Sequence, residues 1–135
     1  MYASILAPID VSVPLIAEQI LKKALFHLQY SDCQVTLLAV APNGADENTL
    51  DEIRGKLMEF AEHHISTHEG RIHLMVEMGL PSNTILDKAD EIHANLILMG
   101  SHRGGTNQLG RSTLGSTAAK IASQATCDVS IVKAS

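Results

Sequence analysis

Residues 96–122 read LILMGSHRGGTNQLGRSTLGSTAAKIA, in which a strand-like run, a glycine-rich segment and the start of a helix follow in direct succession. The apolar run ends at Gly100, and a stretch of small residues suited to a helix begins near Ser116. Five of the nine glycines in the chain lie between residues 100 and 115. A buried strand that leads through such a loop into a helix is typical of α/β proteins that bind anions at one end of a parallel sheet.

The same alternation of strand and helix extends to both ends of the chain. Short apolar runs predict strands over residues 2–9, 34–41, 71–79, 95–100 and 128–134. Amphipathic periodicity predicts helices over residues 14–31, 47–68, 81–94 and 116–125. Strict alternation implies right-handed crossovers, and therefore an open, twisted parallel sheet with helices on both faces. We expect one α/β domain over residues 1–135.

Three details of the pattern make sharper predictions. Alternating residues in 71–79 favour an edge position for this strand, because one of its faces is partly polar. Asp46 or Asn48 is placed to cap the second helix. The first helix is expected to bury one stripe, made of Leu15, Ile16, Ile20, Ala24, Leu25 and Leu28.

Composition restricts the class of protein and its partners. The chain is 45% hydrophobic and 19% charged, contains no tryptophan and has only two cysteines, Cys33 and Cys127. It shows no apolar run that could insert into a membrane and no signal peptide, so we expect a cytoplasmic protein. A net charge of −5 argues against a nucleic-acid partner. Residues from 100 onward nevertheless carry four positive charges and one negative charge, which suits an anionic small ligand.

The carboxyl ends of parallel strands form the usual ligand site of such a sheet. Asp10 follows the first predicted strand, Val40 and Ala41 end the second, and residues 100–105 follow the fourth. Asp10 has two interpretations at this stage. Its carboxylate could cap the turn into the first helix, or it could accept a hydrogen bond from an adenine amino group.

The glycine-rich segment does not match two common phosphate-binding motifs. The dinucleotide fingerprint needs glycines after the first strand, where this chain reads APIDVSVP. GSHRGGT resembles a Walker motif but lacks its lysine, which excludes an ordinary P-loop NTPase. Two interpretations are left: a backbone anion nest that leads to a helix N-terminus, or a flexible loop followed by a Ser/Thr helix cap.

The chain resembles the universal stress proteins of the UspA superfamily over essentially its full length. The resemblance is carried by ILAPIDVS, VTLLAV, GLPSNTILDKADEIHANLILMGSH and LGSTAAKIASQATCDVSIVK, which occur in the family's order. It implies an adenine nucleotide alpha hydrolase-like, Rossmann-like sheet with strand order 3-2-1-4-5. It also implies a homodimer formed through the C-terminal strand, and the binding of ATP or another adenine nucleotide, with or without Mg²⁺.

The resemblance also implies which residues contact the nucleotide. The family pattern Gly-x2-Gly-x9-Gly-(Ser/Thr) begins at Gly100 and ends at Gly115 and Ser116, but here fourteen residues separate the outer glycines, two more than in the pattern. Asp10 and Val40 correspond to the positions that meet adenine. The predicted contacts are Ala7, Pro8, Ile9, Asp10, Val40, Gly100, Ser101, His102, Arg103, Gly104, Gly105, Gly115, Ser116 and Thr117.

The sequence therefore predicts a small cytoplasmic universal stress protein that binds an adenine nucleotide as a regulatory switch in a stress response. The alternatives are a nucleotide-free dimeric interaction module and a slow ATPase in which His102 takes part. No residue is assigned a catalytic role. His64 and His68 lie four residues apart, but no third ligand is evident, so no metal site is expected. The protein partner is not specified by any motif.

Overall fold

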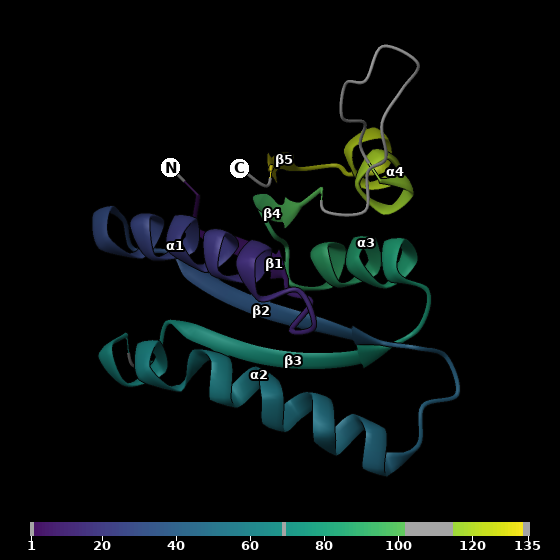
Figure 1. Ribbon diagram of the computed structural model, residues 1–135. Helices are drawn as coiled ribbons and strands as arrows, with labels where there is room; N and C mark the ends of the chain where they lie inside the picture. Colours follow the sequence, from purple (N-terminus) through teal and green to yellow (C-terminus); the bar gives the residue numbers. More distant parts are fainter. Residues whose placement is uncertain (1, 69, 102–114, 134–135) are drawn as a thin grey trace.

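A computed structural model of the chain describes residues 2–68, 70–101 and 115–133. Strands and helices alternate as β1 (Ser4–Pro8), α1 (Pro14–Tyr30), β2 (Gln34–Ala41), α2 (Glu47–Thr67), β3 (Ile72–Met78), α3 (Pro81–Glu91), β4 (Leu96–Gly100), α4 (Ser116–Gln124) and β5 (Asp128–Val132). The strands form one parallel sheet in the order β3-β2-β1-β4-β5, which confirms the predicted fold class and strand order (Figure 1).

Two layers of helices cover the sheet. On one face, α1 and α2 pack over a core that includes Ile5, Leu37 and Leu57. On the other face, α3 and α4 pack over Leu6, Leu38 and neighbouring residues. Consecutive strand residues point to opposite faces, so Leu37 and Leu38 belong to different cores. The central strands are buried on both sides, as their continuous apolar sequences predict.

The position of β3 at an edge confirms the prediction made from its alternating pattern. Ile72, Leu74 and Val76 belong to the core beneath α2, whereas Met75 faces the opposite core. The other edge of the sheet is β5, whose residues are mostly half-buried.

Two details of the helices differ from the sequence predictions. Leu15 is 75% exposed rather than part of the buried stripe. Each residue turns the helix by about 100°, so Leu15 points almost opposite to the centre of the stripe that contains Ile16 and Ile20. The third helix ends at Glu91 rather than at Ala94. His93 adopts a left-handed conformation (φ 54°), and the N–H of Ala94 donates to the carbonyl of Ala89 (2.9 Å), which closes a Schellman motif without glycine.

A buried lysine holds α3 against the edge of the sheet. The Lys88 ammonium lies 2.8 Å from Glu77 of β3 and 2.7 Å from Glu91 of α3. Its hydrogen bonds to Glu77 and Glu91 raise the pKa of Lys88, so the buried side chain remains charged. This contact fixes the helix whose first turn forms part of the site described below.

Asp46 caps α2, as one of the two sequence alternatives proposed, and this makes a pH-dependent prediction. Its carboxylate accepts from the backbone N–H of Thr49 (2.8 Å), and this bond lowers the pKa of Asp46. A lowered carboxyl pKa contributes stability that is complete above the ordinary pKa near 4 and is lost as the pH falls through the folded-state value. We expect Asp46→Ala to lower the melting temperature at pH 7, and the defect to be smaller at pH 3.

Asp46→Asn provides the matched control for this prediction. An asparagine amide oxygen still accepts the Thr49 N–H but carries no charge, so this variant should keep part of the cap at pH 7 and gain on the wild-type protein as Asp46 becomes protonated. An Asp46→Ala defect of equal size at pH 7 and pH 3 would show that the ionised carboxylate does not contribute to the cap. Thermal melts followed by circular dichroism at both pH values are the measurement.

Candidate functional site

A cavity of about 570 Å³ opens at the carboxyl ends of β1, β2 and β4. The strand ends form part of its wall, and residues of all four helices complete it. Its volume lies within the range of small-molecule sites, and its place at the switch point of a parallel sheet is where such sites occur. The cavity is therefore the candidate functional site.

The unequal lengths of β1 and β2 expose backbone groups to the cavity. Pairing between the two strands ends at Pro8 and Leu38, and the N–H of Ile9 donates to the Leu38 carbonyl (2.8 Å). β2 continues to Ala41 alongside β3. Because peptide groups alternate in direction along a strand, the N–H and C=O of Val40 point to the same side as those of Leu38. At Val40 the neighbouring strand has ended, so these groups face the cavity.

Asp10 lies in the turn between β1 and α1. Its carboxylate accepts from the backbone N–H of Ser12 (3.0 Å) and from the Ser12 hydroxyl. The N-cap residue of α1 is Val13, and Pro14 begins the helix. Asp10 therefore caps the turn that leads into the helix, as one of the two sequence interpretations proposed, while the N-cap residue itself is Val13. The residue forms part of the cavity wall.

The N-terminus of α4 opens onto the same cavity. Its N-cap residue is the buried Gly115 (φ −66°, ψ 160°), and among the described residues no side chain makes a capping hydrogen bond there. Backbone N–H groups in the first turn of a helix have no partner within the helix, and the helix dipole adds positive potential. The N-cap residue is thus a glycine, and not a serine or threonine as one of the sequence alternatives proposed. This end of the cavity is suited to an anion.

The rest of the wall is largely apolar, and sequence reasoning did not find it. Ile16 and Ile20 of α1, Ile53 of α2, Ile85 of α3 and Met99 of β4 line the cavity. Their periodicity marked them only as core residues. Among the described residues of the wall, Asp10 and Lys56 are the only ones with a carboxylate or ammonium side chain. Lys56 lies on α2, and no sequence motif indicates a role for it in binding.

The structure brings nine of the fourteen predicted contact residues together on this wall. They are Pro8, Ile9, Asp10, Val40, Gly100, Ser101, Gly115, Ser116 and Thr117. Ala7 is fully buried in the core beneath α1 and is not part of the wall. The other four, His102, Arg103, Gly104 and Gly105, lie outside the described residues.

The histidines near the end of α2 follow Lys56 by seven or more residues in the same helix and do not line this cavity. The ring centroids of His63 and His64 are 5.2 Å apart. Burial is the main cause that lowers the pKa of His64, and the nearby His63 and His68 lower it further. Within the described ranges, no group of three or more His, Cys, Asp or Glu residues is arranged to hold a metal ion. In the same ranges, no helix is both long and apolar enough to cross a bilayer.

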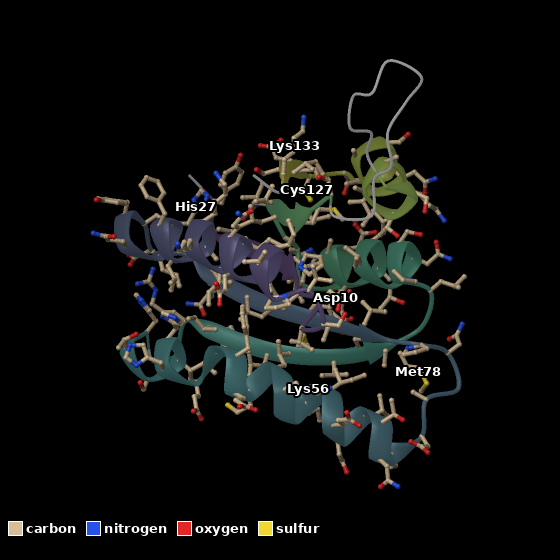
Figure 2. The ribbon with its side chains drawn as sticks, in the orientation of Figure 1. Asp10, His27, Lys56, Met78, Cys127 and Lys133 are labelled. Carbon is tan, nitrogen blue, oxygen red and sulfur yellow. The ribbon has the colours of Figure 1, made fainter. Side chains whose placement is uncertain are left out.

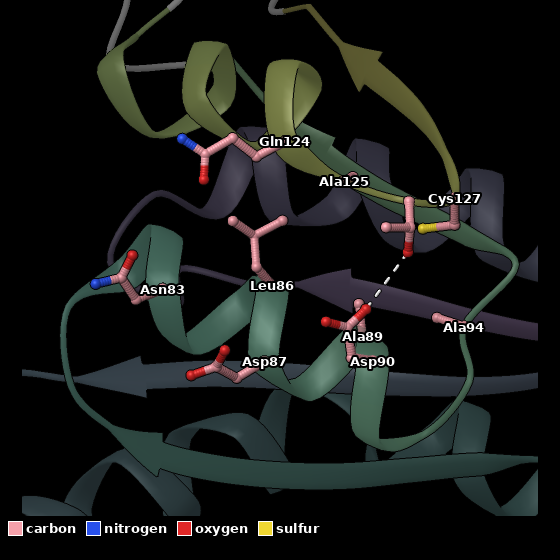
Figure 3. A pocket seen from close by; sticks show the side chains of 10 residues that line it. Asn83, Leu86, Asp87, Ala89, Asp90, Ala94, Gln124, Ala125 and Cys127 are labelled. Atoms are coloured by element: carbon pink, nitrogen blue, oxygen red, sulfur yellow. Dashed lines mark hydrogen bonds between the residues drawn. The ribbon is translucent and has the colours of Figure 1, made fainter.

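A second cavity of about 460 Å³ lies between α3 and the connection from α4 to β5 (Figure 3). Asp87 and Asp90 line it together with Cys127, whose pKa is raised mainly by burial. The Thr126 hydroxyl reaches Asp90 at 3.4 Å. Ala94 lies two residues before β4 and Cys127 immediately precedes β5, so this cavity lies at the amino ends of the strands. That end of a parallel sheet is not where ligands bind.

Comparison with known proteins adds independent information on the whole chain. A family model described as Universal stress protein family matches residues 1–133. Universal stress protein UspA from Lactobacillus plantarum is 24% identical, with 97% of each chain covered and a TM-score of 0.65. The universal stress protein from Archaeoglobus fulgidus in complex with dAMP is 23% identical, with 98% of each chain covered and a TM-score of 0.74.

A more distant solved structure is that of a universal stress protein family protein from Arabidopsis thaliana with AMP bound. It is 14% identical, with 98% of this chain and 92% of that chain covered and a TM-score of 0.68. At these identities the structural likeness shows that the fold is shared.

Proposed function

Because this chain belongs to the universal stress protein family, we propose that it binds ATP or a related adenine nucleotide in the cavity at the carboxyl ends of β1, β2 and β4. One observation carries the proposal. The exposed peptide groups of Val40, the Asp10 carboxylate and the open N-terminus of α4 lie on the wall of one cavity of suitable volume. Related structures contain dAMP and AMP, which supports the same ligand class.

The two ends of the cavity suit different parts of a nucleotide. At the β2 end, an acceptor and a donor from Val40 and the carboxylate of Asp10 match the amino group and ring nitrogens of adenine. At the α4 end, Gly115, Ser116 and Thr117 offer backbone and hydroxyl donors to phosphate oxygens. Gly100 ends β4 and Ser101 follows it. In the chain, these two residues come after Val40 and before Gly115. Mg²⁺ would accompany a polyphosphate.

We further propose a regulatory role, in which nucleotide occupancy reports a cellular state during stress. The sequence lacks the Walker lysine, and no described side chain of the wall is an evident general base for rapid hydrolysis apart from Asp10. The protein acts in the cytoplasm as a homodimer in which the edge strand β5 pairs with a second copy. An edge strand presents backbone groups that such pairing satisfies.

Native mass spectrometry of the purified protein tests binding and assembly together. The expected result is a dimer that carries adenine nucleotide, with the nucleotide identified by chromatography after denaturation. An empty dimer that also takes up no added Mg-ATP would refute nucleotide binding. That outcome would favour the interaction module, in which the longer glycine-rich segment serves a protein partner.

Turnover separates the regulatory role from a slow ATPase. Phosphate release from Mg-ATP should be negligible for the wild-type protein if occupancy alone is the signal. Turnover that is lost in His102→Ala would support the ATPase alternative, whereas turnover that is unchanged in this variant would remove His102 from it.

A further inference from the structure

Among the described residues that line the cavity, Lys56 is the only lysine or arginine. We infer that Lys56 recognises the nucleoside end of the bound nucleotide, where its ammonium donates to an acceptor atom of the base or the ribose. The inference rests on the adenine-nucleotide binding proposed above. It assigns to α2 a role that neither the glycine-rich segment nor the strand ends supply.

The position of α2 in the fold places Lys56 away from the phosphate end. α2 packs on β2 and β3 and belongs to the same face as α1. α4 packs against α3 and β5 on the opposite face. The cavity lies across the ends of β1 and β4 and is lined from both faces, so Lys56 of α2 and the N-terminus of α4 approach it from opposite faces of the sheet. In Figure 2, Asp10 lies between Lys56 and α4.

The surroundings of Lys56 suit a purine nucleoside. Ile53 precedes Lys56 by about one helical turn, and Ile16 and Ile20 of α1 line the same cavity. Branched aliphatic side chains can pack against the faces of a planar base. The polar edge of the base then needs hydrogen-bond partners from other groups. Asp10 can accept from an exocyclic amino group, whereas a ring nitrogen or ribose hydroxyl needs a donor. Lys56 is a donor with three N–H bonds.

The ammonium of Lys56 is available to a ligand because its own partner holds it weakly. It lies 3.1 Å from Glu52, one turn earlier on α2, and the two side chains are 57% and 67% exposed. Ion pairs of this kind between exposed residues contribute little to stability. The flexible four-carbon stem of lysine allows the ammonium to exchange Glu52 for a ligand atom at small cost.

The test compares two charge-removing variants of the same helix. Lys56→Ala removes the inferred contact. Arg54→Ala is the matched control, because Arg54 forms a similar exposed pair with Asp51 (2.9 Å) and is not part of the cavity wall. Dissociation constants for adenosine, AMP and ATP are measured by two-dimensional NMR titration of the full chain, which extends to the millimolar range.

We expect Lys56→Ala to weaken all three ligands by a similar factor of about ten, since a charge-assisted hydrogen bond is lost at the part they share. Arg54→Ala should leave all three within about twofold, and Lys56→Arg should retain most of the affinity. Unchanged binding to Lys56→Ala would overturn the inference. A loss for AMP and ATP without a loss for adenosine would also overturn it, because it would make Lys56 a phosphate contact.

Failure of the inference is distinct from failure of the proposed function. If the wild-type protein binds none of the three ligands, the adenine-nucleotide proposal fails and the inference fails with it. If the wild-type protein binds ATP and Lys56→Ala binds it equally well, only the role of Lys56 is lost.

Discussion

Gly115→Val is expected to weaken ATP binding by about a hundredfold or more. The valine side chain would stand at the N-cap of α4 and separate the phosphates from the N–H groups of the first turn. Loss of two hydrogen bonds to a charged group, each worth about 1.5–3 kcal/mol, accounts for a change of this size. Adenosine lacks phosphate, so its affinity should fall far less than that of ATP.

The backbone at Gly115 permits this substitution, which makes the experiment informative. Its φ of −66° and ψ of 160° are favourable for a β-branched residue, so the substitution introduces no backbone strain, and a thermal melt shows whether the buried position accommodates the side chain. Gly55→Val is the matched control, because a Cβ added at Gly55 on α2 meets no atom within 4 Å. Isothermal titration with ATP and thermal melts are measured on both variants. ATP affinity equal to that of the wild-type protein would show that α4 does not hold the phosphates.

Gly79→Ala is expected to lower the free energy of unfolding by about 3 kcal/mol. Gly79 connects β3 to α3 with a φ of 154°, a conformation that residues with a Cβ rarely adopt. A Cβ there would lie 2.5 Å from the side-chain oxygen of Thr84, which is too close for any contact. The N–H of Gly79 also donates to the carbonyl of Ala41 (2.9 Å), so a shift of the turn would disturb β2.

A double variant divides this loss between its two causes. Thr84→Ala alone should change stability little, and combined with Gly79→Ala it removes the steric clash but not the backbone strain. Urea denaturation of the four proteins should therefore show that the double variant recovers part of the loss. If Gly79→Ala with Thr84→Ala is no more stable than Gly79→Ala alone, the clash does not contribute. Because Pro81 lines the cavity two residues later, we also expect Gly79→Ala to weaken ATP binding.

Helix ends and surface orientation were the parts of the fold that local sequence described least well. His93 ends α3 in a left-handed conformation, although glycine is the residue usually associated with that position. Leu15 is apolar yet points to solvent, because a helix that starts at Pro14 turns this side chain away from the sheet. The end of α3 and the orientation of Leu15 both depend on where a helix lies relative to the sheet. Composition alone does not determine that position.

The residues of the candidate site also form two groups, those whose position could be predicted from the sequence and those whose position could not. Asp10, Val40, Gly100, Gly115 and Ser116 follow strands or begin a helix, so their shared location follows from strand order and the carboxyl-end rule. The isoleucines of the wall could be identified only as buried residues. Lys56 lies in a helix with no motif, at a point where α2 reaches the mouth of the cavity. No pattern in a single sequence distinguishes it from other exposed lysines.

The sequence by itself determined the alternation of nine elements, the parallel sheet and its edge strand β3, because hydrophobic periodicity is a local property of the chain. It also placed Asp10 and Gly115 at element ends. Only the tertiary structure decided that β2 extends beyond the end of β1 and exposes the peptide groups of Val40. It also decided that α2 brings Lys56 to the same cavity. Such features depend on the register and packing of segments that are far apart in the chain. Register and packing are set by the contacts of the folded protein and not by local sequence.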